Sequence, residues 1–462
     1  MQFSFLFPLT NHFCLFTTIC ITLINIAASN LTFPNSFIEQ LHSGENRTVR
    51  ILGIFPNTRQ FNPKTYTCSR HSLKDIQLTQ AMIYTINHFV NNNSKLLPGI
   101  KVNYKILDSC SSRHAAVTFL TSSLAASETE SCQQLGSNNA VVSKHSSSTG
   151  HVPTIGVVAE KQKALQQLLH HIQVAYTYRK TTSPLELQVL AIADIVAYFN
   201  WNWVSIVIGG LDTFNNLQKI LFSPFENHNE KIVFKFLEAA QTQNLTGKTF
   251  IGTYSWLKSS GLKNISGDVI EGALGIDIKD QSLQKYVNYL NNLDLCNNPG
   301  NPWLIRSWHE MFSLPGQMPI SNVFLPPCHL SPNLKRTLFR NFYETNHITE
   351  FVMDSVLALA YALHDYIGCN SSYCPPVPLN LMANNRTEFV KAISNVSFES
   401  ATTDKFRFRP DGSSQLKYQI TNLKPFKNAN VNTVIKTKIG SWEEKRGLSI
   451  NYDKIVWNGE KK

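Results

Sequence analysis

Two kinds of apolar pattern alternate along the first half of the chain. The apolar-rich run VRILGIFP predicts a buried strand at residues 49–56, KVNYKILDSC predicts the next strand at 101–110, and a short strand is expected near Thr154. Runs with apolar residues three and four positions apart predict helices at 75–92 and 114–126. Strands that alternate with helices are typical of an α/β fold with parallel sheets, so this is the fold class that the pattern predicts.

The same alternation continues to residue 278, and the pattern then changes near the C-terminus. Further helices are expected at 163–174 and 185–200, and further strands at 201–210, 248–255 and 272–278. The last part of the chain contains LKYQI, VNTVIKTKIGSW and LSINYDKIVW, in which polar and apolar residues alternate singly. This period of two predicts an antiparallel or mixed extension of a sheet.

A long apolar helix is expected from Phe351 to Ile367, and two cysteines follow it. One face carries Val352, Val356, Leu359, Leu363 and Ile367. Cys369 and Cys374 could bind zinc with a second close pair, but the sequence has no such pair. A redox pair is usually spaced Cys-x-x-Cys, so a disulfide that closes a short loop is favoured.

The N-terminus determines the compartment on which this interpretation depends. Residues 1–29 hold no Lys, Arg, Asp or Glu, and their apolar run ends in Ala27, Ala28 and Ser29. This predicts a cleaved secretory signal, with an uncleaved anchor as the alternative because the usual positive flank is missing. No later stretch has the roughly 20 apolar residues that span a bilayer. We therefore expect a protein that is secreted or lies at the extracellular face of the plasma membrane.

Export would place the cysteines in an oxidising compartment, where thiols pair. Seven cysteines follow the signal, and an odd number leaves one for a second chain or as a free thiol. Eight Asn-x-Ser/Thr sequons are candidate glycosylation sites. They begin at Asn30, Asn46, Asn92, Asn244, Asn264, Asn370, Asn385 and Asn395.

Composition and motifs exclude several functions. The net charge of +11 is spread along the chain without a dense Lys/Arg patch, so no nucleic-acid partner is expected. The sequence has no nucleophile turn, phosphate loop, dinucleotide turn or His-Glu-x-x-His motif. A secreted hydrolase on an α/β scaffold was considered, but no nucleophile, base or metal set supports it. We therefore expect no enzyme, no cofactor and no metal site.

Several segments in collinear order carry a resemblance to a known family. They are ILGIFP, QAMIYTIN, LLPGIKVNYKILDSC, ADIVAYFNWNWVSIV, EGALGIDI, NNPGNPWLIRSWHEMF, the helix from Phe351 to His364, YQITN and IGSWEEKRGLSINYDKIVW. Together they resemble the extracellular ligand-binding domain of class C G-protein-coupled receptors, most closely the metabotropic glutamate receptors. The similarity spans nearly all of the chain after the signal.

The resemblance implies a Venus-flytrap domain of the type I periplasmic-binding-protein-like fold. Such a domain has two α/β lobes, each with a parallel-rich sheet and flanking helices, that close on a small ligand. The expected boundaries are a signal at 1–29, lobe 1 at 30–183 and 273–415, and lobe 2 at 184–272 and 416–457. Residues 458–462 are expected to form a tail before an absent cysteine-rich and transmembrane region.

The resemblance also assigns the cysteines. It pairs Cys68 with Cys110 and Cys369 with Cys374, and it makes Cys132 the residue that links two protomers. Cys328 matches half of another family bridge whose usual partner is missing, so Cys296 is the candidate replacement. These assignments give the odd cysteine a use.

Departures from the family concern the glutamate-binding positions. Leu78 stands where the family has a cationic side chain, and Gly156-Val157-Val158-Ala159 replaces a serine turn. The run after Tyr176 is shortened, Tyr254 replaces an acidic residue, and Thr387 replaces a lysine. A buried amino-acid zwitterion needs partners for its charges, and most of them are lost here. By position, the remaining candidate ligand-binding residues are Thr177, Tyr178, Tyr254, Trp256 and Arg386.

These observations predict a receptor ectodomain that binds a small, amino-acid-like ligand between its lobes and pairs with itself or a related receptor. A G protein would be a partner only if a membrane region exists outside this chain. The alternative is a secreted, non-signalling decoy or disulfide-linked dimerisation partner with a vestigial cleft. Lobe 2 is shortened between Trp201 and Ser255, which fits either a divergent receptor or an incomplete gene prediction.

Overall fold

The structure is a computed structural model of the 462-residue chain. It describes residues 37–40, 47–62, 67–118, 120–121, 123, 152, 154–159, 185–202, 237–257, 262, 265–278, 283–294, 298, 300–312, 331, 349–376, 386–400, 405–409, 414, 417–428 and 431–458. The expected signal at 1–29 and the expected helix at 163–174 lie outside these residues, as does most of the expected strand at 201–210.

The chain forms two compact units. Unit 1 consists of residues 1–181 and 283–398, and unit 2 consists of residues 182–282 and 399–462. From the sequence, the chain was expected to pass from one lobe to the other after residues 183, 272 and 415. The second and third of these boundaries differ most from the boundaries of the two units. The strand near residue 276 explains one difference, because it pairs within the sheet of unit 2. Its sequence showed that it is a strand but not which sheet it joins.

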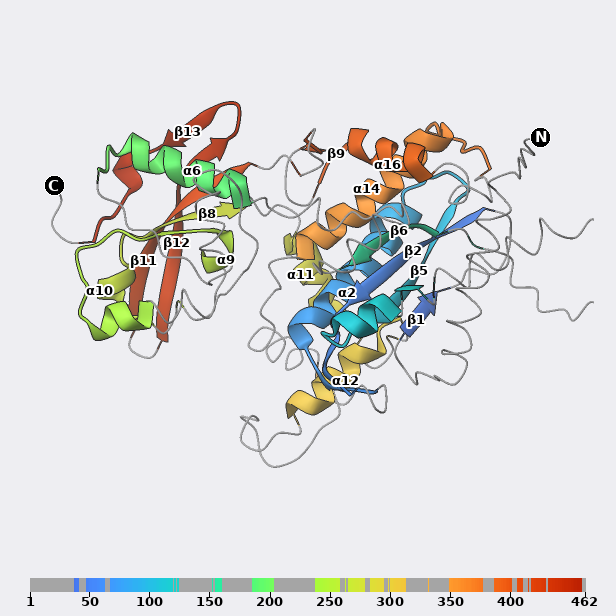
Figure 1. Ribbon diagram of the computed structural model, residues 1–462, viewed down its shortest axis with the longest axis horizontal. Helices are drawn as coiled ribbons and strands as arrows, with labels where there is room; N and C mark the ends of the chain where they lie inside the picture. Colours follow the sequence, from blue (N-terminus) through green and yellow to red (C-terminus); the bar gives the residue numbers. More distant parts are fainter. Residues whose placement is uncertain are drawn as a thin grey trace, which may run out of the picture. The chain divides into compact units, whose positions relative to one another are not determined.

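The sheet of unit 1 is built from the apolar runs of the N-terminal third (Figure 1). Its order is β1 (Phe37–Gln40), β5 (Lys101–Asp108), β2 (Thr48–Phe55) and β6 (Thr154–Ala159). The strand β2 pairs in parallel with both β5 and β6, and β1 adds antiparallel to β5. Parallel strands are covered on both faces, which explains why every residue of β6 is buried.

Helices cover this sheet. The long helix α14 (Thr349–Ile367) packs on α2 (Leu73–Thr85), α16 (Arg386–Asn395) and β6. Residues Thr349 to Ala360 of α14 are all buried, which confirms it as a core helix. The helix expected at 75–92 is α2 followed by a π-helical turn, η1 (Ile86–Asn91). Thr85 donates its hydroxyl to the carbonyl of Ala81 at this junction, a bond that competes with the regular helical ladder.

Unit 1 contains three further groups of elements. The hairpin β3 (Thr58–Asn62) and β4 (Thr67–His71) follows β2 directly. The helices α11 (Leu283–Asn292) and α12 (Pro302–Phe312) come from the second stretch of chain in this unit. α12 packs against α2 and β4, and the short strand β9 (Ser397–Phe398) ends the unit.

The sheet of unit 2 has the order β13, β12, β11, β8 and β7 (Figure 1). Its long hairpin is β11 (Tyr418–Asn428) and β12 (Val431–Glu443), flanked by β13 (Gly447–Ile450) and β8 (Leu274–Ile278). These strands pair antiparallel, and within the described part of this sheet only β7 (Ile251–Gly252) pairs in parallel, with β8. The antiparallel C-terminal extension is thus present, whereas the described sheet is less parallel than expected.

The helices of unit 2 include two that the sequence did not predict. α6 (Leu185–Tyr198) was expected, whereas α10 (Gly267–Ile270) was not, and α9 (Tyr254–Leu257) replaces the end of the strand expected at 248–255. In the first turn of α9, the carbonyl of Thr253 accepts hydrogen bonds from the N–H groups of Trp256 and Leu257. This turn folds the Trp256 ring back over Gly252, where a Cβ atom would lie 1.4 Å from the ring. The short strand β10 (Phe406–Arg407) and the turn η4 (Tyr452–Lys454) complete this unit.

Candidate functional site

The carboxyl ends of β2 and β5 gather polar side chains in unit 1. Asn57 and Thr58 follow β2, while Asp108 and Ser109 lie at the end of β5, and all four are buried. In open α/β sheets the carboxyl ends of parallel strands are where ligands usually bind. This edge is therefore the first place to look for a site.

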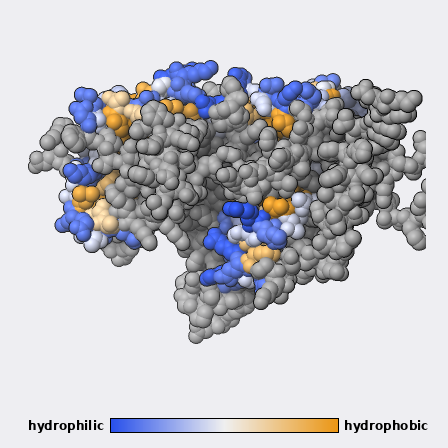
Figure 2. All heavy atoms as spheres, viewed as in Figure 1, coloured by the Kyte–Doolittle hydropathy of each residue, from blue (hydrophilic) through white to orange (hydrophobic). Residues whose placement is uncertain are grey.

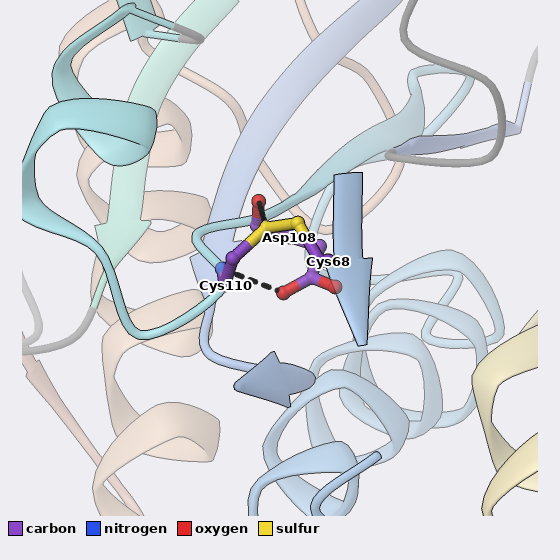
Figure 3. A group of neighbouring side chains, drawn as sticks. All are labelled: Cys68, Asp108 and Cys110. Carbon is purple, nitrogen blue, oxygen red and sulfur yellow. Dashed lines mark hydrogen bonds between the residues drawn. A yellow bond between two sulfur atoms is a disulfide. The ribbon is translucent and has the colours of Figure 1, made fainter. Parts of the chain in front are cut away.

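Asp108 organises this edge (Figure 3). One carboxylate oxygen accepts the N–H of Thr58 at 3.1 Å and the N–H of Cys110 at 2.9 Å, and the other accepts the Thr58 hydroxyl at 2.6 Å. Burial raises the pKa of Asp108 above its usual range, although the hydrogen bonds from Thr58 and Cys110 act in the opposite direction. The carboxylate thus holds the loop after β2 against the loop after β5.

A disulfide between Cys68 and Cys110 lies directly beside this carboxylate (Figure 3). The two sulfur atoms and an Asp108 oxygen lie within 4.8 Å of one another, which is a spacing that a metal ion could accept. A cysteine binds a metal as a thiolate, however, and here the two sulfur atoms are joined in a disulfide. The cluster consequently offers one carboxylate and acts as a structural staple of the β3–β4 hairpin.

Two further contacts fix that hairpin over the sheet edge. Glu310 of α12 accepts the backbone N–H of His71 at 2.7 Å and contacts its ring nitrogen Nδ1 at 2.6 Å. Arg59 bonds to Asp75 at 3.1 Å, at the start of α2. These contacts at exposed positions tie the hairpin to α12 and to the start of α2.

Two of the positions that depart from the family are buried in unit 1. Leu78 is 1% exposed and belongs to the apolar side of α2. Residues 156–159 continue β6 to its end and are all buried, so they form strand rather than a serine-type turn. At both places the side chain belongs to the core.

The candidate ligand-binding residues are distributed over both units, and the structure describes the side chain of only one of them. Thr177 and Tyr178 lie outside the described residues. Tyr254 begins α9 and Arg386 begins α16, and only their backbones are described. Trp256 is 6% exposed and lies in a core cluster of unit 2 with Leu257, Val269, Ile270 and Leu423. Its indole nitrogen is buried without a hydrogen-bond partner among the described residues.

The disulfide and sequon assignments can be placed in the same way. The structure contains the bridges Cys68–Cys110 and Cys369–Cys374, the second of which directly follows α14. Cys132, Cys296 and Cys328 lie outside the described residues. The sequon asparagines that the structure describes are all exposed, namely Asn92, Asn244, Asn370 and Asn395. Asn30, Asn46, Asn264 and Asn385 are not among them.

On the face drawn in Figure 2, the coloured residues are mostly hydrophilic, with small hydrophobic areas between them. Its exposed large apolar side chains come from different elements, for example Leu190 of α6, Tyr373 after α14 and Ile435 of β12. Among the described helices, none combines the length and the apolar character needed to cross a bilayer.

Comparison with known proteins decides the family. The sequence profile of the receptor family ligand binding region matches residues 77–236 and 220–425, which is most of the chain and includes parts of both units. The chain belongs to this family. The type I periplasmic-binding-protein-like fold expected from the sequence is thereby confirmed.

Individual relatives are metabotropic glutamate receptors. One from Drosophila melanogaster is 23% identical over 506 residues, covering 86% of this chain and 50% of the relative. Metabotropic glutamate receptor 4 of Mus musculus is 24% identical over 84% of this chain and 48% of its own length. Metabotropic glutamate receptor 8 of Homo sapiens is 24% identical over 82% and 47%. The chain therefore spans about half the length of these relatives, which are receptors and not enzymes.

Sequence reasoning missed the role of Asp108 and the turn at Gly252. Asp108 could have been found, because it is an acidic residue at the end of a buried strand and two positions before a paired cysteine. Gly252 gave no such signal. Its need for a small side chain depends on the ring of Trp256, which lies one residue beyond the strand expected at 248–255.

Proposed function

We propose that this chain is the extracellular ligand-binding region of a metabotropic-glutamate-receptor-like class C receptor. It binds a small, amino-acid-like molecule between its two lobes. The observation that carries this proposal is the family match, which extends from α2 of unit 1 through β11 of unit 2. The exposed sequon asparagines that the structure describes in unit 1, Asn92, Asn370 and Asn395, support export and an extracellular location.

The ligand we propose is not glutamate. A glutamate molecule brings two carboxylates and an ammonium group, and each needs a partner inside a closed site. The family resemblance places a cation at the position of Leu78, and this apolar side chain is buried in α2. Trp256, in contrast, keeps a buried indole N–H without a described partner, which a ligand acceptor could satisfy.

Binding would act by a shift in population. A ligand that prefers the closed arrangement of the lobes stabilises it in proportion to that preference. A G protein would respond only through a membrane region outside this chain. Within the chain itself, the measurable consequence is stabilisation of the folded protein.

A thermal-shift screen of the secreted protein tests this function. The proposal expects at least one neutral amino acid or related small molecule to raise the unfolding temperature in a saturable way. A ligand at 100 times its Kd stabilises by roughly 2.7 kcal/mol. No stabilisation by any member of a broad amino-acid panel would contradict the binding proposal.

A second candidate function is a non-signalling pairing partner, linked to another receptor chain by a disulfide. The buried apolar residues at family ligand positions favour it, because a vestigial site needs no charged partners. The odd number of cysteines after the expected signal also fits, with Cys132 as the linking residue. A non-reducing gel should show a covalent dimer that Cys132→Ser abolishes. A monomer in both samples would contradict this second function.

A further inference from the structure

The last described segment of the chain, Asn451–Asn458, lies on unit 2 without joining its sheet. It begins where the N–H of Asn451 donates to the carbonyl of Ile439 at 2.7 Å, and it continues through the turn η4. Residues 455–458 form neither helix nor strand. Their backbone groups need partners from elsewhere, and two asparagine side chains are involved in supplying them.

The first asparagine belongs to the sheet. Asn422 of β11 is completely buried, and its amide holds Val456 from both sides. Its oxygen accepts the N–H of Val456 at 2.9 Å, and its nitrogen donates to the carbonyl of Val456 at 3.1 Å. This side chain therefore pairs with Val456 as a neighbouring strand would.

The second asparagine belongs to the segment itself. Asn458 donates its amide nitrogen to the carbonyls of Asp268 at 2.8 Å and Val269 at 3.2 Å, both in α10. Its amide oxygen accepts the N–H of Gly247 at 3.1 Å. One side chain thus ties the end of the segment to two separate parts of unit 2.

The close approach of this segment depends on Gly272. The residue has a φ of +76°, and a Cβ atom there would lie 2.5 Å from the backbone nitrogen of Asn458. Both the left-handed backbone and the lack of space require glycine. Unit 2 is therefore shaped to receive the backbone of residues 457 and 458.

Aromatic rings cover the outer side of the segment. The ring of Trp457 packs edge-on against Phe199 with centroids 5.1 Å apart, and it lies 6.0 Å from Trp201. Ile455 is 7% exposed. Pulling the segment off would expose these side chains as well as break the asparagine contacts.

We propose that Asn451–Asn458 is a strap that is locked to unit 2 by Asn422, Asn458 and Gly272, so that the chain leaves this unit from a fixed point. The side chain of Asn458 can be substituted without altering a core residue. The strap also rests on α10, whose Val269 and Ile270 pack in the same cluster as Trp256. The strap and unit 2 consequently move together. This inference is independent of the proposed ligand.

Hydrogen exchange measured by mass spectrometry on the full chain tests the strap. Asn458→Ala removes three hydrogen bonds and should raise the exchange rates of peptides from 451–458 about 10- to 100-fold. Asn458→Asp keeps the shape but loses both donors and places an acidic oxygen against two carbonyls, so it should have at least as large an effect. Lys454→Ala, at an exposed position of the same turn, is the matched control and should leave the rates unchanged.

Two results would overturn the proposal. The first is a strap that exchanges as fast in the unaltered protein as in Asn458→Ala. The second is an equal increase in peptides from β8 and β11, because the substitution would then loosen the whole of unit 2 instead of releasing the strap. Protection that is lost only from 451–458 supports it.

Discussion

Replacing Asp108 by alanine should destabilise unit 1 by about 3 kcal/mol. The carboxylate is 2% exposed and accepts three hydrogen bonds from Thr58 and Cys110. Alanine would leave these donors buried without an acceptor, at a cost of roughly 1 kcal/mol each at the low end of the usual range. Loss of the carboxylate also releases the loop after β2 from the loop after β5.

Asparagine at the same position is the matched control. Its oxygen can still accept the N–H groups of Thr58 and Cys110, and the Thr58 hydroxyl can turn to accept from the new amide. We therefore expect Asp108→Asn to cost less than about 1 kcal/mol at neutral pH. The difference between the two variants isolates the hydrogen bonds from the volume of the side chain.

The free energy of unfolding is best read locally, because the chain has two units. Hydrogen exchange of peptides from β2 and β5 reports on unit 1 without a contribution from unit 2. The disulfide must stay oxidised in all samples, since Cys110 belongs to it. If Asp108→Ala were as stable as Asp108→Asn within about 0.5 kcal/mol, the proposed role of the carboxylate would be refuted.

Three other predictions concern Asp108, Gly252 and Leu78. Because burial raises the pKa of Asp108, the unfolded chain loses this proton first as the pH rises from about 4. The stability that this group contributes is therefore fully present below the unfolded pKa and falls as the pH rises through the folded pKa. Urea unfolding across pH should show this decline in the unaltered protein and not in Asp108→Asn. The same pH profile in both proteins would contradict the prediction. Gly252→Ala should destabilise unit 2 by at least about 1–3 kcal/mol because its Cβ meets Trp256, measured as faster exchange in β7 and β8, and unchanged exchange would count against that packing. Leu78→Ala should cost about 2–5 kcal/mol in unit 1, while a loss below about 1 kcal/mol would show that Leu78 is not a core residue.

Three strands of unit 1 and the long helix α14 could be predicted from the sequence, because their patterns are local, whereas the edge strand β1 was not expected. β2, β5 and β6 are rich in apolar residues, and α14 repeats its apolar residues along one face. Burial on both sides of a parallel sheet leaves little room for another interpretation. The bounds of β2 and β5 accordingly fall within two residues of the expected ones.

The turn from β7 into α9 could not be predicted, because its cause is a contact and not a pattern. Residues 248–255 are apolar and polar in a way that suits a strand, but the Trp256 ring folds over Gly252 and the chain turns there. The same limit applies to β8, whose five residues do not specify their partner. Pairing over a distance in sequence is decided by packing that a local pattern does not contain.

The loss of glutamate-binding side chains stays a prediction. The structure shows only that Leu78, which the family resemblance places at a ligand position, is buried in α2. The hydrogen bonds of Asp108 join residues fifty positions apart and needed the fold to become visible. The other candidate residues, including Thr177, Tyr178, Tyr254 and Arg386, stay predictions.

Titration calorimetry of the secreted chain with glutamate tests the central claim most directly. Because Leu78 is buried in the core and we propose that the charged partners of glutamate are replaced, we predict no saturable heat at glutamate concentrations of about 1 mM, where a Kd of that size corresponds to only about 4 kcal/mol of binding free energy. A saturable isotherm with a Kd of about 1 μM, near 8 kcal/mol, would contradict the account.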